Sequence, residues 1–240
     1  MTVRAIVFDL GDTLFGLDPL PPDLPGWIAA CLVANEALEP VAAADVARRG
    51  IASLRDEVTA SFAAGHLLET DMADLSRRHF SGAGARVDEA LAVELGDVFG
   101  RADVARFRPP EDVAARVEAF RRAGYRLAAV SNTTTRPALL EAFLTEVGLL
   151  PLFDTVVFSC AVGVRKPHPD IYGVALAALD VAAGQVVFVG DRVREDVRGP
   201  QALGMRAVLT HEFRQEDPAG SGPLAVVGRL DELHAVLGTG

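Results

Sequence analysis

Carboxylates follow two separate apolar runs of the chain and could do chemistry together. Asp9 and Asp12 lie just past the first apolar run, and Asp191 and Asp196 follow a later one. Clustered carboxylates, together with a backbone carbonyl, make a hard, oxygen-rich site for Mg²⁺. A carboxylate can also attack phosphorus and form an aspartyl-phosphate. These residue types therefore favour metal-assisted phosphoryl transfer.

Two further polar groups would complete such a site. Ser131 follows the apolar segment 126–130, and Lys166 lies in the loop after the segment 155–159. A hydroxyl and an ammonium can neutralise phosphoryl oxygens as charge spreads over them in the transition state. Lys166 is the one lysine among 23 basic residues. A compositional bias towards arginine explains why lysine is absent elsewhere, and it makes the lysine that remains worth attention.

Short apolar segments precede these groups and are typical of buried strands. They span residues 3–8, 126–130, 155–159, 186–189 and 206–209. Amphipathic stretches between them predict helices over 111–123, 137–147, 170–179 and 195–203. This alternation predicts an α/β fold with a doubly wound parallel sheet. Ligands bind at the carboxyl ends of the strands in such sheets. We therefore expect four groups to meet at one edge, namely Asp9, Ser131, Lys166 and the pair Asp191 and Asp196.

Residues 17–104 break this alternation. After a proline-rich start, the pattern predicts helices over 26–38, 42–64, 67–80 and 87–100, with no convincing strand. We therefore expect an all-helical domain at 17–104, inserted into an α/β core formed by residues 1–16 and 105–240. A polar surface loop at 214–223, a short strand at 225–227 and a helix at 230–237 are expected to close the core.

The motifs, taken in order, resemble the four signatures of the haloacid dehalogenase (HAD) superfamily of hydrolases, in its phosphatase branch. The matching segments are FDLGDTL, VSNTT, VRKPHPDIY and VGDRVRED. The resemblance covers residues 1–15 and about 105–237, and the helical insertion lies where the family carries its C1 cap. It implies a Rossmann-like core with a mobile cap, and substrate specificity that resides largely in the cap.

The resemblance also implies roles for individual residues. Asp9 matches the nucleophile, and Ser131 and Lys166 match the residues that bind and neutralise the phosphoryl group. Asn132 is a further candidate phosphate ligand, although helix capping explains it about as well. Mg²⁺ is implied as the cofactor; its expected ligands are Asp9, the acidic pair Asp191 and Asp196, and the backbone carbonyl of Gly11.

The first motif departs from the family pattern D-x-D-x-T at Gly11, where the family's general acid/base aspartate would stand. Glycine still supplies the metal-binding carbonyl but lacks the carboxylate, and general acid/base help is typically worth about 10²–10⁴ in rate. The loss matters least for good leaving groups, such as sugar 1-phosphates or acyl phosphates. Asp12 is a candidate substitute that would act through a water, although a turn carboxylate is the preferred interpretation.

Other functions remain open beside a phosphatase. The family's 2-haloacid dehalogenases also lack the second aspartate, but they carry a tyrosine there and need no metal. Phosphonoacetaldehyde hydrolases need a cap lysine, which residues 17–104 lack, and phosphohexose mutases depend on the second aspartate. A HAD-like binding or regulatory module with weak turnover is supported by Gly11 alone, against four intact positions.

Bulk composition restricts the partners. A net charge of −10 argues against a nucleic-acid footprint, which needs a basic face. No apolar run approaches the roughly 20 residues of a membrane span, and the N-terminus does not resemble a secretory signal. The two cysteines, Cys31 and Cys160, have no metal or redox spacing. The sequence thus predicts a cytoplasmic enzyme acting on a small phosphorylated substrate, and it gives no indication of oligomeric state.

Overall fold

The computed structural model describes residues 2–238 and divides into two compact units. The core unit comprises Met1–Asp18, Phe107–Thr133 and Glu141–Gly240. The insert unit comprises Pro19–Arg106 together with Thr134–Leu140. The domain boundaries expected from the sequence stay a prediction, and each unit is taken by itself below.

A six-stranded sheet forms the centre of the core unit. Its order is β5 (Thr155–Phe158), β4 (Arg126–Ser131), β1 (Ala5–Phe8), β6 (Val186–Gly190), β7 (Arg206–Thr210) and β8 (Ala225–Val227). Every neighbouring pair is parallel. The predicted α/β fold with a parallel sheet is therefore confirmed, and β1 lies at its centre with β4 on one side and β6 on the other.

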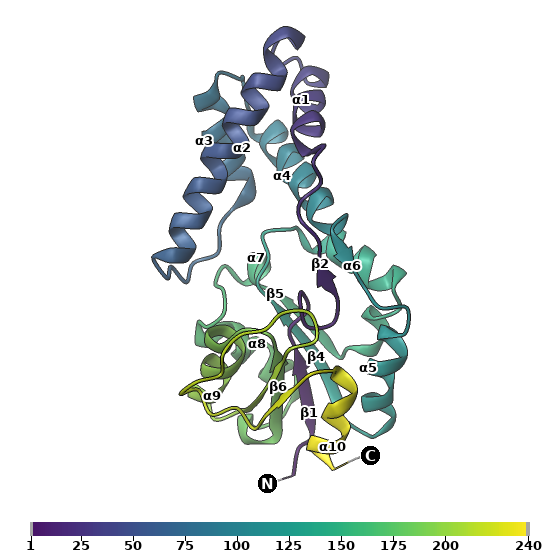
Figure 1. Cartoon of the computed structure of the whole chain (residues 1–240). Coiled ribbons are helices and arrows are strands. Elements are labelled where there is room, and N and C mark those ends of the chain that lie inside the picture. Colours follow the sequence, from purple (N-terminus) through teal and green to yellow (C-terminus); the bar gives the residue numbers. More distant parts are fainter. Residues whose placement is uncertain (1, 239–240) are drawn as a thin grey trace. The chain divides into compact units, whose positions relative to one another are not determined.

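Helices cover both faces of this sheet (Figure 1). They are α5 (Val113–Arg122), α6 (Pro137–Glu146), α7 (Ser159–Val162), α8 (Pro169–Leu179), α9 (Gly199–Ala202) and α10 (Leu233–Leu237). Successive strand residues point to opposite faces. Val7 accordingly packs in a cluster with Ile171 of α8, whereas the ring of Phe8 contacts that of Phe120 in α5 at 6.0 Å between centroids.

The structure differs from the sequence expectations in several local elements of the core unit. The helix expected over 195–203 is a π-helix, η3 (Val193–Arg198), followed by the short α9. A two-stranded antiparallel ribbon of β2 (Gly16–Leu17) and β3 (Phe107–Arg108) was not predicted, because two residues carry no periodicity. Short 3₁₀ turns complete the unit: η1 (Leu150–Leu152), η2 (Ala183–Gln185) and η4 (Leu230–Glu232).

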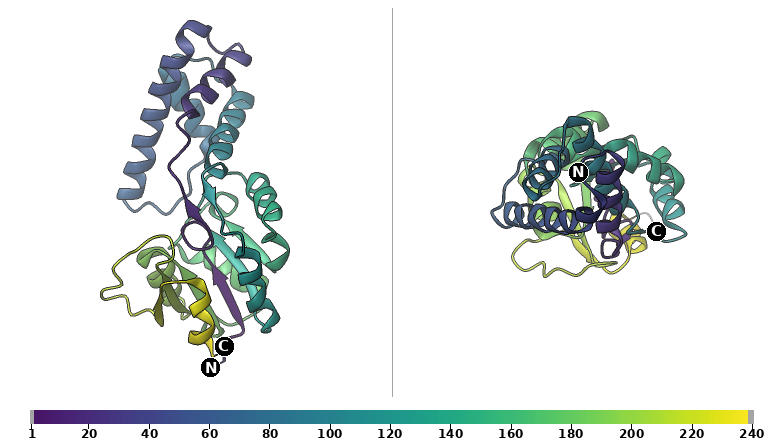
Figure 2. Two further views of the ribbon diagram at one scale, coloured as in Figure 1. Left: turned by 45° about the vertical axis from the view of Figure 1, so that its right-hand side comes forward. Right: turned by 90° about the horizontal axis from the view of Figure 1, so that it is seen from above.

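The insert unit is built from four helices packed along one another (Figure 2). They are α1 (Leu24–Ala34), α2 (Pro40–Ala63), α3 (Met72–Ala83) and α4 (Glu89–Val104). The expected start of the third helix at residue 67 was wrong, because Asp71 caps α3 through the amides of Ala73 and Asp74 at 2.8 and 3.2 Å. Fully buried apolar side chains, such as Leu32, Leu75 and Leu95, form its core.

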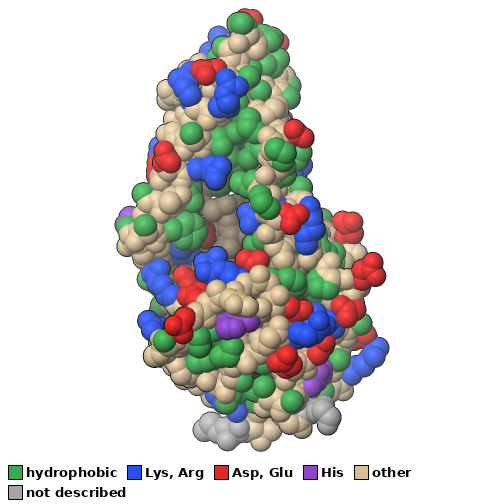
Figure 3. Space-filling view, in the orientation of Figure 1, with side chains coloured by type: hydrophobic (Ala, Val, Ile, Leu, Met, Phe, Trp, Pro, Cys, Tyr) green, Lys and Arg blue, Asp and Glu red, His purple; other side chains and the backbone are tan. Residues whose placement is uncertain are grey.

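Arginine and acidic side chains are interspersed on the side that Figure 3 shows. Among residues 2–238, no helix combines the length and the apolar character that a membrane span requires.

Candidate active site

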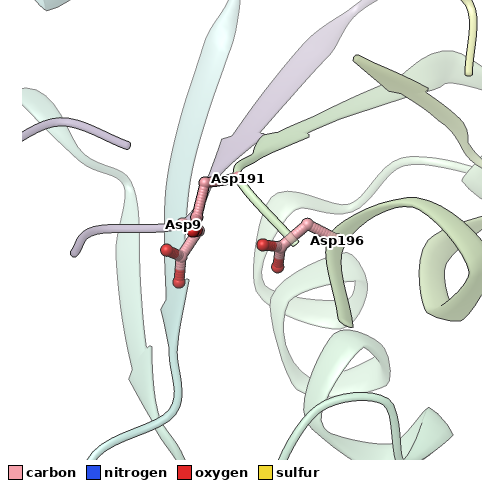
Figure 4. A group of neighbouring side chains, drawn as sticks. All are labelled: Asp9, Asp191 and Asp196. Carbon is pink, nitrogen blue, oxygen red and sulfur yellow. The ribbon is translucent and has the colours of Figure 1, made fainter. Parts of the chain in front are cut away.

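The register of the central strands brings two aspartates together. Asp9 follows the end of β1, and its amide donates to the carbonyl of Val189 in β6 at 2.8 Å. Asp191 follows the last residue of β6. With Asp196 of η3, the three carboxylates offer oxygens that all lie within 4.8 Å of one another, and all three side chains are buried. Figure 4 shows the Asp196 carboxylate turned towards Asp9.

Asp196 reaches the sheet edge because the chain folds back tightly on itself. Its carboxylate Oδ2 accepts the amide N–H of Arg192 at 3.0 Å. A Cβ built on Gly190 would overlap the side chain of Asp196. Glycine at the end of β6 is therefore what permits the aspartate five residues after Asp191 to return to the site.

Lys166 ties the cluster together. Its Nζ donates to Oδ1 of Asp9 at 2.6 Å and to Oδ1 of Asp196 at 2.7 Å, and its side chain is 2% exposed. The side-chain amide of Asn132 bonds both sides of the Lys166 main chain, accepting its N–H at 2.7 Å and donating to its carbonyl at 3.1 Å. Asn132, which the sequence indicated as a phosphate ligand, thus holds the lysine in place; phosphate binding by Asn132 stays a prediction.

The charges of the cluster oppose one another. Burial raises the pKa of Asp9, and the Lys166 ammonium offsets this only in part. Burial, followed by the neighbouring charge of Asp196, raises the pKa of Asp191 to about 6, and burial raises that of Asp196 to about 6 against the effect of Lys166. Burial alone would lower the pKa of Lys166, but its two carboxylate partners outweigh burial and raise it. At neutral pH Lys166 is therefore charged, and Asp191 and Asp196 are largely ionised.

Arg214 is a site residue that sequence reasoning missed. It lies in the segment interpreted as a polar surface loop, yet its Nη1 donates to Oδ2 of Asp191 at 3.2 Å and to Oε2 of Glu216 at 2.8 Å. The signal was available, because the loop leaves the carboxyl end of β7, the strand beside β6. The rule that polar groups after parallel strands meet at one edge applies to it as well.

The donor set fits a divalent cation. Three carboxylates against the single charge of Lys166 leave a formal charge of −2 among groups that are all less than 10% exposed, and buried like charges are costly unless they are compensated. Within the cluster, Arg214 contacts the carboxylate of Asp191, and it is itself about a third exposed. Hard carboxylate oxygens suit Mg²⁺. The carbonyl of Gly11 remains a predicted fourth ligand.

The remaining predicted residues lie at or just after the carboxyl ends of β1 and β4. Thr13 donates its hydroxyl to Oδ2 of Asp9 at 3.4 Å. Ser131 ends β4, the strand beside β1, and is half-buried. Asp12 has a φ of 55°, a left-handed conformation that aspartate tolerates, and its amide donates to the carbonyl of Phe15 at 2.8 Å. Among the described residues, the Asp12 carboxylate accepts no hydrogen bond, and its role as a substitute acid/base stays a prediction.

Comparisons with known proteins agree with this geometry. A family model described as haloacid dehalogenase-like hydrolase matches residues 3–204. Phosphoserine phosphatase of Thermus thermophilus is 38% identical over 143 residues, which are 59% of this chain and 56% of that protein. Ribulose-1,5-bisphosphate 5-phosphatase of Halopiger xanaduensis is 28% identical over 94% of this chain and 92% of its own length. Glyceraldehyde 3-phosphate phosphatase of Methanopyrus kandleri is 26% identical over 90% and 87%.

Solved structures extend the likeness in fold. A HAD phosphatase from Thermococcus onnurineus matches with a TM-score of 0.65 and 23% identity, over 99% of both chains. A 2-haloacid dehalogenase from Pseudomonas syringae matches with a TM-score of 0.70, also at 23% identity and over 99% of both chains. Because both phosphatases and dehalogenases share the fold, the choice between them depends on the site residues.

Proposed function

The chain belongs to the haloacid dehalogenase-like hydrolases, and from this premise we propose that it is a Mg²⁺-dependent phosphatase of a small phosphorylated metabolite, acting through an aspartyl-phosphate on Asp9. The observation that carries the proposal is the buried cluster in which Lys166 bridges Asp9 and Asp196 beside Asp191. The curated relatives compared above, all phosphatases of small metabolites, support the same choice.

The two oxygens of Asp9 have different tasks in this reaction. Oδ1 accepts the short hydrogen bond from Lys166, whereas Oδ2 accepts the Thr13 hydroxyl at the longer distance of 3.4 Å, which leaves Oδ2 the better placed of the two for attack. Oδ2 forms a bond to phosphorus as the bond from phosphorus to the ester oxygen breaks. The leaving alkoxide takes a proton from solvent water, because Gly11 offers no carboxyl group. A water molecule then attacks phosphorus and the bond from phosphorus to Oδ2 breaks. The attacking water gives up a proton to solvent, inorganic phosphate leaves, and the Asp9 carboxylate is restored.

The other residues stabilise charge around these steps. Lys166 and Ser131 are proposed to neutralise the phosphoryl oxygens, because Lys166 Nζ contacts Asp9 and Ser131 ends β4, the strand beside β1. Asp191 and Asp196 would hold Mg²⁺, which when bound supplies further neutralisation of phosphoryl charge. Thr13 and Asn132 keep the nucleophile and the lysine oriented.

The acidic cluster also weighs against the alternatives. The metal-independent dehalogenases have no need of a divalent site, whereas three buried carboxylates converge here. A binding module without turnover does not need a nucleophile held within 2.6 Å of a buried ammonium.

The proposal is tested by phosphate release from a panel with and without Mg²⁺. The panel contains an aryl phosphate and the substrates named for the relatives: phosphoserine, glyceraldehyde 3-phosphate and ribulose 1,5-bisphosphate. We expect release from at least one compound with Mg²⁺, loss of release with EDTA and recovery when Mg²⁺ is restored. Folded protein that releases no phosphate would favour a binding module, and metal-independent halide release from a 2-haloacid would favour a dehalogenase.

Restoring a carboxylate at Gly11 should raise turnover selectively. Gly11 has no positive φ, so an aspartate suits its backbone, but a Cβ there would approach the Leu17 side chain at 3.1 Å. Leu17 must therefore shift slightly. We expect Gly11→Asp to raise kcat by about 10²-fold on alkyl phosphates, which have poor leaving groups, and much less on an aryl phosphate.

The matched control for this prediction is Gly11→Asn, which fills the same space without an ionisable group. Steady-state kinetics of both variants on the two substrate types separate the acid from the added bulk. Equal gains on good and poor leaving groups, or an equal gain from asparagine, would contradict the leaving-group argument.

A further inference from the structure

Tyr172 is a fully buried residue of α8 whose hydroxyl leaves its own helix to donate to the main-chain carbonyl of Glu195 in η3. We propose that Tyr172 is a positioning residue for the metal site, fixing Asp196 through the carbonyl that precedes it. The inference rests on the proposed function in one respect, namely that Asp196 belongs to a Mg²⁺ site.

The carbonyl of Glu195 needs a donor because its own helix supplies none. In an α-helical turn it would accept the amide of Gly199, but the Gly199 N–H donates to the carbonyl of Arg194 in the π pattern. In the π pattern, the Glu195 carbonyl would accept the amide of residue 200, but that residue is Pro200, which has no N–H. A buried carbonyl without a partner is costly. The Tyr172 hydroxyl fills this vacancy and so stabilises the π register.

The hydrogen bond acts directly on Asp196. The Glu195 carbonyl and the Asp196 amide belong to one planar peptide unit, so fixing the oxygen fixes the orientation of the amide. That amide donates to the carbonyl of Arg192 at 2.8 Å, and the carboxylate is then placed between the Arg192 N–H and Lys166 Nζ. π-turns of this kind often lie at functional sites.

The surroundings of the hydroxyl are shaped to admit it. A Cβ built on Gly199 would overlap Tyr172 Oη, so glycine leaves the room that the hydroxyl occupies. The Tyr172 ring packs edge-on against Phe188 at 5.6 Å between centroids, and Lys166 Nζ lies 5.2 Å from the centroid of the same Phe188 ring. Tyr172 thus contacts the main chain next to Asp196 through its hydroxyl, and its ring packs on Phe188, the ring that also lies beside Lys166 Nζ.

The first test is the Mg²⁺ affinity of Tyr172→Phe, measured by isothermal titration calorimetry without substrate. The variant keeps the ring and loses only the donor. Because partners that orient metal ligands typically contribute about 10–100-fold in affinity, we expect Kd for Mg²⁺ to rise at least 10-fold. The matched control is Tyr125→Phe, which removes the hydroxyl of the other tyrosine in the chain and should leave Kd unchanged.

The second test restores a donor from the main chain. Pro200→Ala restores the N–H that, in the π pattern, would donate to the Glu195 carbonyl. In the Tyr172→Phe background, it should recover most of the lost Mg²⁺ affinity, whereas alone it should change little. A role of Tyr172 in general packing would lower the melting temperature of both Tyr172→Phe proteins and give no recovery of affinity.

The outcomes separate this inference from the proposed function. Wild-type protein that binds Mg²⁺, with Tyr172→Phe binding it equally well, overturns the inference alone; so does a lack of recovery in the double variant. Wild-type protein that neither binds Mg²⁺ nor releases phosphate overturns the proposed function. If Tyr172→Phe does not fold, Gly199→Ala displaces the hydroxyl from the other side while keeping Tyr172, and the same rise in Kd is expected.

Discussion

Asp9→Asn is expected to lower phosphatase turnover by roughly 10⁴-fold or more, as loss of a covalent nucleophile does in other enzymes. The amide has nearly the shape of the carboxylate, so Lys166 should keep its bond to Asp196 and the site should stay folded. What is lost is the Oδ2 lone pair that attacks phosphorus, because an amide oxygen is a poor nucleophile. Steady-state phosphate release measures the loss, and acid quenching with labelled substrate should trap phosphoryl-enzyme in the wild type only.

Asp12→Asn is the matched control for the Asp9 experiment. It removes a carboxylate three positions along the same loop, and asparagine also tolerates the φ of 55° found there. If Asp12 is a turn residue, turnover should change only slightly. A deep loss in Asp12→Asn, steepest on poor leaving groups, would instead identify Asp12 as the substitute acid/base. Asp9→Asn with near-normal turnover would disprove the nucleophile assignment.

The architecture of the core could be predicted from sequence because its strands are buried on both faces. Segments such as 126–130 and 186–189 read as continuous apolar runs, and the structure places strands there within about one residue. The same pattern predicted the site. Polar residues that directly follow neighbouring parallel strands lie at the same edge of the sheet and therefore come close to one another. The juxtaposition of Asp9, Asp191 and Lys166 followed from that rule.

What the sequence did not indicate depends on contacts that have no local pattern. Asn132 was predicted as a phosphate ligand because it directly follows Ser131 at the end of a strand. The group to which it is hydrogen-bonded, the main chain of Lys166, lies 34 residues later and could not be seen in the local sequence. Arg214 was missed because its loop was interpreted from its polarity alone and not from its place after β7, the strand beside β6. In the π-turn after Asp191, Pro200 has no N–H to offer the Glu195 carbonyl, and the donor that takes its place, the Tyr172 hydroxyl, comes from a helix, 23 residues earlier.

Lys166→Met is expected to destabilise the metal-free protein as well as abolish turnover. Methionine has a similar length and no charge, so Asp9 and Asp196 would be left buried without their bridging cation. Removing one partner of a buried ion pair typically costs about 3–5 kcal/mol, which for a chain of this size corresponds to a fall of about 10 °C in melting temperature. Thermal unfolding in EDTA measures the effect.

The pH dependence of this loss has a definite sign. Without the ammonium, the folded state raises the pKa values of the three carboxylates further above those of the unfolded chain, so the folded protein binds more protons at mildly acid pH. Its stability therefore falls as pH rises through those raised pKa values. The melting temperature of Lys166→Met should lie closer to that of the wild type at pH 5 than at pH 8.

A second substitution distinguishes charge from packing in the Lys166→Met protein. Adding Asp196→Asn removes one of the stranded charges while keeping the side-chain shape, so the double variant should be more stable than Lys166→Met alone. Lys166→Arg keeps the charge but needs more room in a site where the lysine is 2% exposed, so it should keep part of the stability and little of the turnover. If the double variant were no more stable, the loss would come from packing, and the ion pairs of Lys166 would contribute little to the fold. Near-normal kinetics of Lys166→Arg would show that charge alone, without the geometry of the ammonium, is enough for the reaction.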